Sequence, residues 1–149
     1  VYQVREIGRR VDFLSVGTND LTQYLLAVDR NNPRVASLYH TMHPAVLRAL
    51  QTIREKASSV GCELSVCGEL AGDPLGAVLL LGLGYTNLSM SASSLLRVKS
   101  MLSQVSQEEA RALVKRAMRL SDAEQVRELF IRRLDRPQLT KLYRPLLNL

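Results

Sequence analysis

The chain has 149 residues, of which 46% are hydrophobic and 23% are charged, a composition typical of folded globular domains and unlike that of disordered or fibrous chains. Its apolar runs are much shorter than the roughly 20 residues that a membrane span needs, and its first residues do not resemble a signal peptide. We therefore expect a cytoplasmic protein without membrane association. Two cysteines, Cys62 and Cys67, are too few for a disulfide framework, and no further cysteines complete a zinc site.

The net charge of +6 comes from the C-terminal third of the chain. Residues 1–96 contain eight basic and eight acidic side chains, whereas residues 97–149 contain twelve basic and six acidic ones. A basic excess can mark a nucleic-acid interface, but no aromatic interleaving, glycine-rich strand motif or helix-turn-helix pattern accompanies it. We interpret it as solvated basic helix faces and expect no nucleic-acid partner.

The first half of the chain alternates short apolar runs with helical patterns, which predicts βα units and a parallel sheet. After a helix-like segment over residues 2–10, a strand is predicted over residues 11–16, followed by a turn over residues 17–20. A short helix is then predicted from about Leu21 to Val28. The order of these elements is that of a first βα unit.

Two further βα units are predicted downstream. A helix with Pro44 at its first position runs to Gly61 and precedes a strand over residues 63–67. A loop over residues 68–72 then leads to a buried helix that Asp73 caps. The third unit is predicted to consist of a strand over residues 87–90 and a helix that ends near Leu102.

The pattern changes after the third unit. Ser106 and Ser121 are each followed three residues later by a glutamate, which matches the capping box and predicts two helices with basic outer faces. Three parallel strands do not close a barrel, and a (βα)8 barrel needs roughly 250 residues. If the three units belong to a barrel, most of it lies outside this chain.

Polar groups are expected at the carboxyl ends of the predicted strands, because loops there project side chains toward one rim. Asp20 offers a hard oxygen that suits Mg²⁺, and Asn19 offers an amide donor. Arg30 has forked donors that match phosphate or carboxylate oxygens. An Asn-Asp pair is also a common turn dipeptide, and Arg30 could be an ordinary surface charge, so the residues alone leave both interpretations open.

Cys67 precedes a glycine and a glutamate at the same predicted rim. A thiol is mostly protonated at neutral pH, so it can act as a general acid toward a carbanion or an enolate. Cys62, at the start of the strand, fits the more common role of a small buried apolar residue. Neither histidine is near the rim motifs in sequence, and we expect His43 to be a local cap or packing residue.

Three segments resemble the phosphoenolpyruvate-utilising enzymes, namely residues 12–24, residues 27–30 and residues 67–73. Within that superfamily they are most similar to enzyme I of the phosphotransferase system, and residues 43–47 and 89–93 favour its nitrogen-related form. The resemblance implies an α/β fold that forms part of a (βα)8 TIM-type barrel. The last three βα units, with parallel strands, would occupy residues 1–104, and a helical extension over residues 105–149 would pack on the same domain.

The resemblance also implies roles for the candidate residues. Asp20 would bind Mg²⁺, Asn19 and Arg30 would bind phosphoenolpyruvate, and Cys67 would protonate the enolpyruvate carbon to give pyruvate. In such enzymes a histidine on a separate domain receives the phosphoryl group and passes it to a small phosphocarrier protein. Because this chain has neither that domain nor the earlier strands, we expect the isolated chain to be inactive.

Two alternatives to the enzyme fragment remain. The parent enzyme is expected to be a homodimer, and open strand edges could also cause self-association. The chain could therefore be a non-catalytic dimerisation module. It could also be a fragment of a pyruvate phosphate dikinase or phosphoenolpyruvate synthase relative.

Overall fold

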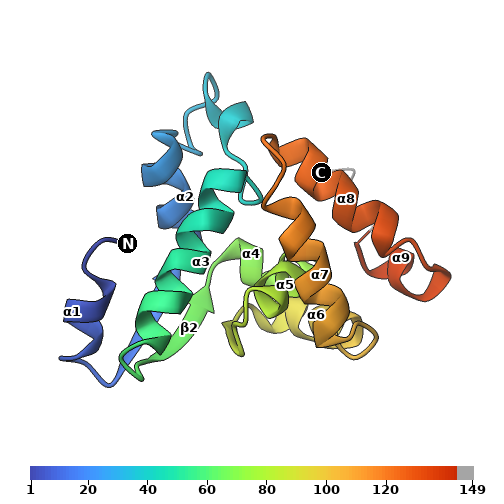
Figure 1. The fold of residues 1–149 in the computed structure, drawn as a ribbon. Helices are drawn as coiled ribbons and strands as arrows, with labels where there is room; N and C mark the ends of the chain where they lie inside the picture. The colour runs from blue at the N-terminus through green and yellow to red at the C-terminus, as the bar shows by residue number, and fades with distance from the viewer. Residues whose placement is uncertain (144–149) are drawn as a thin grey trace.

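The computed structural model describes the backbone of residues 1–143 and the side chains of residues 1–140, and it contains one three-stranded parallel sheet. The strands are β1 (Phe13–Gly17), β2 (Glu63–Cys67) and β3 (Asn87–Ser89), in the spatial order β1-β2-β3. Helices connect them, as parallel neighbours require (Figure 1). The predicted α/β fold with three parallel strands is confirmed, and these strands form an open sheet.

The first βα unit differs from its prediction at the end of the strand. Helix α1 (Val4–Gly8) precedes β1, and α2 (Thr18–Leu26) follows β1 directly. The turn predicted over residues 17–20 is therefore wrong, because Thr18 begins a helix. Its hydroxyl donates to the Cys67 carbonyl at 2.9 Å, and its carbonyl accepts from the Thr22 hydroxyl at 2.7 Å. The first bond holds the start of α2 against the end of β2, and the second lies within α2.

Helix α3 (Pro44–Ser58), which follows a 3-10 helix over Ala36–Leu38, begins as predicted. His43 is its N-cap, and the Nδ1 atom accepts from the Ala45 N–H at 3.1 Å. The expected local capping role of His43 is thus confirmed. One stripe of α3 faces the core and consists of the buried residues Val46, Leu47, Leu50, Ile53 and Ala57.

The second unit contains an additional short helix between its strand and its main helix. The loop predicted over residues 68–72 is wrong, since Glu69–Gly72 form α4. Asp73 then caps α5 (Pro74–Gly82) by accepting from the Leu75 N–H at 3.4 Å, as predicted. Every residue from 74 to 80 is buried, so α5 is the central helix of the core, and α6 (Ala92–Leu102) follows β3.

Three helices form the tail, whereas two were predicted: α7 (Gln107–Ala117), α8 (Ala123–Arg133) and α9 (Pro137–Tyr143). Ser106 caps α7 as predicted, accepting from the Glu109 N–H at 3.1 Å. The prediction for Ser121 is wrong, because Asp122 caps α8. Its carboxylate accepts two N–H groups of the first turn at 2.7 and 3.1 Å, and a carboxylate also suits the positive end of a helix.

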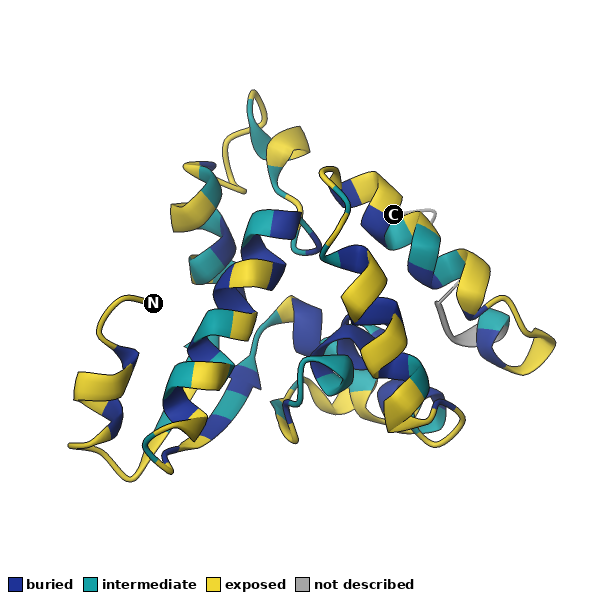
Figure 2. Cartoon of the chain, in the orientation of Figure 1, coloured by how far each residue is buried: buried dark blue, intermediate teal, exposed yellow. Residues whose placement is uncertain are grey.

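The tail shares one hydrophobic core with the sheet and its helices. A Cβ atom on Gly82 of α5 would lie 2.4 Å from the carbonyl oxygen of Ala110 in α7, so these two helix backbones meet where no side chain fits. Figure 2 shows buried positions along the inner sides of these helices. The tail contributes the buried residues Ala110, Leu113, Val114, Ala117, Val126, Phe130, Leu134 and Leu139.

The sheet is covered on one face only. Leu64 and Val66 of β2 are buried among the helices, while side chains alternate between faces along a strand. On the other face, Phe13 is 62% exposed and Ser15 is exposed. Parallel sheets are normally covered on both faces, so this arrangement leaves one face and the outer edges of β1 and β3 open. Within residues 1–143, no helix is long and apolar enough to cross a membrane.

Candidate functional site

The strand register brings the predicted motifs to one edge of the sheet. Gly17 of β1 pairs with Cys67 of β2, which in turn pairs with Ser89 of β3. These residues end their strands, and the chain then enters α2, α4 and the segment before α6. The carboxyl ends of all three strands therefore carry the polar groups, as the sequence predicts.

Asn19 and Asp20 lie in the first turn of α2, immediately beyond β1. Asp20 is exposed, and its Oδ2 atom lies 3.8 Å from the position that a Cβ on Gly17 would occupy. The carboxylate is thus close to the end of β1, on the edge that also holds Cys67. Asp20 does not belong to a group of three potential metal-binding side chains, and no such group of His, Cys, Asp and Glu occurs in the described part of the chain.

Cys67 is half-buried at the end of β2 and is not in a disulfide. Its Sγ atom accepts a long hydrogen bond of 3.7 Å from the hydroxyl of Ser15, on the open face of the sheet. Cys62 is buried in the core, as predicted for a small apolar residue. The two cysteines therefore differ in environment, and only Cys67 is at the polar edge.

Arg30 reaches the same edge from the loop after α2. Its Nη1 atom lies 3.1 Å from Oε1 of Glu69, the first residue of α4. The side-chain oxygen of Asn19 accepts from the Glu69 N–H at 3.2 Å and from the Tyr39 hydroxyl at 3.4 Å. Glu69 thus joins two of the predicted substrate-binding residues through its side chain and its backbone.

Tyr39 keeps its proton in this cluster. Burial and then the carboxylate of Glu69 raise the pKa of the Tyr39 phenol, and Arg30 opposes this rise only partly. The phenol consequently remains a hydrogen-bond donor to Asn19 at neutral pH, which orients the amide of Asn19 with its nitrogen directed away from Tyr39.

Gly68 allows the close approach of these segments. Its φ of +110° is a conformation that side-chain-bearing residues rarely adopt. An added Cβ would lie 2.5 Å from the hydroxyl oxygen of Thr18 and 3.2 Å from Oδ1 of Asn19. Glycine is therefore required for α2 and the start of α4 to meet.

A hollow of about 520 Å³ opens beside the cluster, between α2, α4 and the start of α6. This volume is within the range of small-molecule sites. The polar side chains that line it include Asn19 of α2, Glu69 of α4, and Ser91, Ser94 and Arg97 at or near the start of α6. Asp20, Arg30 and Cys67 are at the same sheet edge but are not among the residues that line this hollow.

Sequence reasoning missed several members of the cluster. Ser15 could have been found, because the two-residue period of a strand places it on the same face as the end of β1. Glu69 was noticed only as an acidic neighbour, and Tyr39 carried no signal. Their contacts with Arg30 and Asn19 join residues 39 and 20 positions apart, which local patterns do not reveal.

Comparisons with known proteins match the part of the chain that contains these residues. Residues 1–107 match a family model described as the PEP-binding domain of PEP-utilising enzymes. A Salmonella typhimurium protein named "Phosphoenolpyruvate-dependent phosphotransferase system" is 50% identical over 127 residues, which are 85% of this chain and 17% of that protein. A Bacillus subtilis phosphoenolpyruvate-protein phosphotransferase is 41% identical over 121 residues, which are 81% of this chain and 21% of that protein. The chain thus spans about a fifth of the length of these curated relatives.

Proposed function

The chain belongs to the PEP-utilising enzyme family, and from this premise we propose that residues 1–104 are the C-terminal part of a phosphoenolpyruvate-binding (βα)8 barrel in an enzyme I-type phosphotransferase. The open face and open edges of the sheet support this proposal, because a closed barrel would cover both. Residues 43–47 and 89–93 favour the nitrogen-related form of the enzyme.

The observation that carries the proposal is the cluster of Arg30, Asn19 and Glu69 beside Cys67. Arg30 and Asn19 supply donors for the phosphate and carboxylate oxygens of phosphoenolpyruvate. The substrate must compete with the carboxylate of Glu69 for Arg30, which is 3.1 Å away. Glu69 thereby holds the guanidinium at the sheet edge until an anion replaces the carboxylate.

Asp20 could bind Mg²⁺ at this edge only together with ligands from outside this chain. Asp20 is exposed and provides one carboxylate, and Mg²⁺ in phosphate-binding sites commonly uses one or two protein carboxylates together with water and substrate oxygens. A second carboxylate would come from strands of the parent protein outside this chain. When bound, the ion supplies positive charge that stabilises the transferring phosphoryl group.

Cys67 provides the proton that completes the reaction. When the bond between the phosphoryl group and the enol oxygen breaks, the electron pair remains on the enolate of pyruvate. The thiol then donates its proton to the enolate carbon, which forms the methyl group of pyruvate and leaves a thiolate. The hydroxyl of Ser15, 3.7 Å from Sγ, is placed to stabilise that thiolate.

The phosphoryl acceptor lies outside this chain. His43 is engaged as the N-cap of α3, and neither it nor His40 matches the phosphorylated histidine of the family. We propose that a histidine on another domain of the parent accepts the group and passes it to a small phosphocarrier protein. The parent would act as a cytoplasmic homodimer, and the isolated 149 residues would be inactive.

The test replaces Cys67 by alanine in the full-length parent protein. We expect pyruvate formation to fall by about 10²- to 10⁴-fold, the usual contribution of a general acid, with the dimer and the phosphoenolpyruvate Kd essentially unchanged. Cys62→Ala is the matched control and should leave turnover within about twofold, because Cys62 is in the core. Unchanged turnover in Cys67→Ala would instead support the alternative, a non-catalytic dimerisation module.

A further inference from the structure

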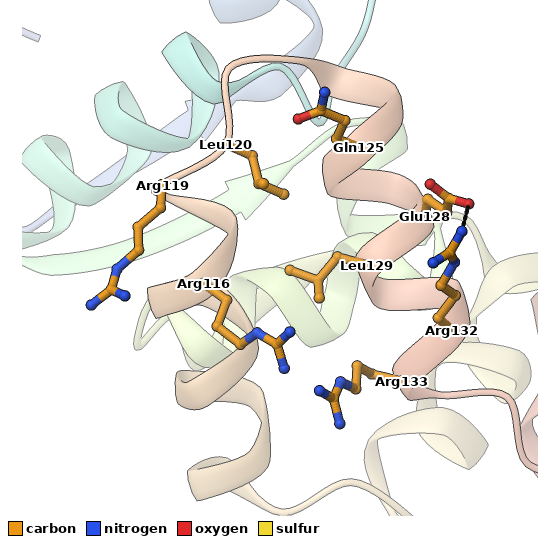
Figure 3. Close-up of a pocket in the computed structure, with 8 residues that line it drawn as sticks. All are labelled: Arg116, Arg119, Leu120, Gln125, Glu128, Leu129, Arg132 and Arg133. Atoms are coloured by element: carbon orange, nitrogen blue, oxygen red, sulfur yellow. Dashed lines mark hydrogen bonds and ion pairs between the residues drawn. The ribbon is translucent and has the colours of Figure 1, made fainter.

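The tail contains a second hollow, of about 640 Å³, between α7 and α8 (Figure 3). It lies beyond residue 107, where the match to the family model ends, and on different elements from the cluster around Arg30. Four arginines line it, together with Leu120, Gln125, Glu128 and Leu129. The residues that matter for its charge are Arg116, Arg119, Arg132 and Arg133.

The positive charge in this hollow is poorly compensated. Glu128 forms an ion pair with Arg132, but no described carboxylate within ion-pair distance neutralises Arg116 or Arg133. Figure 3 shows their guanidinium groups extending from α7 and α8 into the space between the two helices, while Arg119 points away from α8. Residues 141–149 contain no Asp or Glu, so they add no side-chain carboxylate.

Two guanidinium groups facing one space repel each other unless an anion lies between them. Their forked donors match phosphate oxygens in a bidentate manner. Leu120 and Leu129 are half-buried and present an apolar surface between the helices. The lining thus combines anion donors with a surface for an apolar or planar group.

We propose that this hollow binds an organic diphosphate, with the diphosphate between Arg116 and Arg133 and the organic group against Leu120 and Leu129. Glu128 offsets the charge of Arg132, so the guanidinium groups of Arg116 and Arg133 are the uncompensated positive charges that face the hollow, and they attract the anionic diphosphate. A single inorganic phosphate would leave the leucines uncovered. This proposal does not depend on the proposed phosphoenolpyruvate site at the sheet edge.

The test is isothermal titration calorimetry of the 149-residue chain with ADP at low ionic strength. We expect one binding site, and we expect Arg116→Gln combined with Arg133→Gln to weaken ADP binding at least about tenfold, because two charge-assisted contacts are lost. The control combines Arg111→Gln with Lys115→Gln, which removes the same charge from α7 outside the hollow. It should change the Kd by less than about twofold, as should Arg30→Gln.

Several results would overturn the proposal. One is an absence of ADP binding at about 1 mM, and another is an equal loss in the two double variants, which would show a diffuse field. If adenosine bound as tightly as ADP, the arginines would not contribute to binding through the diphosphate. If pyrophosphate bound as tightly as ADP, the leucines would not contribute through the organic group. If a DNA duplex displaced ADP, and if both double variants weakened DNA binding equally, the hollow would be part of a general polyanion-binding surface. Circular dichroism of each variant checks that the fold is kept.

Discussion

The sheet and the helical tail bury their apolar side chains to very different extents, although both contribute to one core. The two phenylalanines of the chain show the difference. Phe130 in α8 is completely buried, whereas Phe13 in β1 is 62% exposed. Phe130 therefore contributes to stability within this chain, whereas Phe13 lies on the face of the sheet that the described residues leave open.

Replacing each phenylalanine by alanine should separate the two regions most strongly. We expect Phe130→Ala to lower the free energy of unfolding by about 3–5 kcal/mol, because a large buried side chain leaves a cavity. Phe13→Ala should change it by less than about 0.5 kcal/mol, as is usual for exposed positions. Urea unfolding followed by circular dichroism measures both. Equal losses would mean that the open sheet face is covered in solution.

A substitution at the sheet edge should have the next largest effect. Gly68→Ala is expected to cost about 1–3 kcal/mol, because the alanine must adopt a positive φ and its Cβ would collide with the hydroxyl of Thr18. Gly61→Ala is the matched control, since Gly61 also has a positive φ but no atom within 4 Å of an added Cβ. Thermal unfolding of the two variants should rank Gly68→Ala as the less stable. The reverse order would contradict the close contact between α2 and α4.

Asp73 connects the two regions, because it caps α5 and lies 3.9 Å from Arg127 of α8. Burial raises the pKa of Asp73 above its usual value of 3.8, and Arg127 counteracts only part of this rise. The folded state therefore holds the proton more tightly than the unfolded state. The contribution of Asp73 to the free energy of unfolding is fully present below pH 3.8 and is lost as the pH rises through the raised pKa.

Two variants of Asp73 separate the effect of its ionisation from the effect of its cap on α5. Asp73→Asn keeps an oxygen that can cap α5 but cannot ionise, so the stability of this variant relative to the parent should improve as the pH rises from 3.8. Asp73→Ala removes the cap as well and should be about 1 kcal/mol less stable than Asp73→Asn at every pH. Urea unfolding between pH 3 and about pH 7 measures both differences. An Asn variant with the parent's pH profile would refute the role of the buried carboxylate.

The smallest stability effect is expected for Glu69→Gln. The Arg30 and Glu69 side chains are 37% and 68% exposed, so their ion pair should contribute less than about 0.5 kcal/mol. In the full-length protein the same substitution should tighten phosphoenolpyruvate binding, because Arg30 no longer has a competing carboxylate. Weaker binding would show that Glu69 is needed to position Arg30 even when the substrate is present.

The sequence predicted the order and type of most elements because their signals are local. Pro44, His43 and Asp73 marked helix starts through their own side chains, and the strands were predicted within two residues of their observed ends. Errors arose where two local interpretations compete. The dipeptide Asn19-Asp20 suits a turn as well as a first helical turn, and only the contact of Thr18 with the end of β2 decides between them.

The candidate site could be predicted only in part, because local sequence signals do not reveal contacts between distant segments. A strand followed by polar residues indicated the edge at which Asp20 and Cys67 lie. The pairing of Arg30 with Glu69 and the contact of Tyr39 with Asn19 depend on how distant loops fold together. Nor did composition show that the basic side chains of the tail gather around a hollow, because that depends on the angle between α7 and α8.

The pairing of Gly17 with Cys67, and of Cys67 with Ser89, has a consequence for how such a site can change over evolutionary time. Neighbouring strands are about 4.8 Å apart because main-chain hydrogen bonds set that spacing, whatever the side chains are. Mutations in the surrounding helices can therefore accumulate without altering the separation of the reactive groups. Functional divergence at this edge should proceed by exchanging side chains at fixed positions.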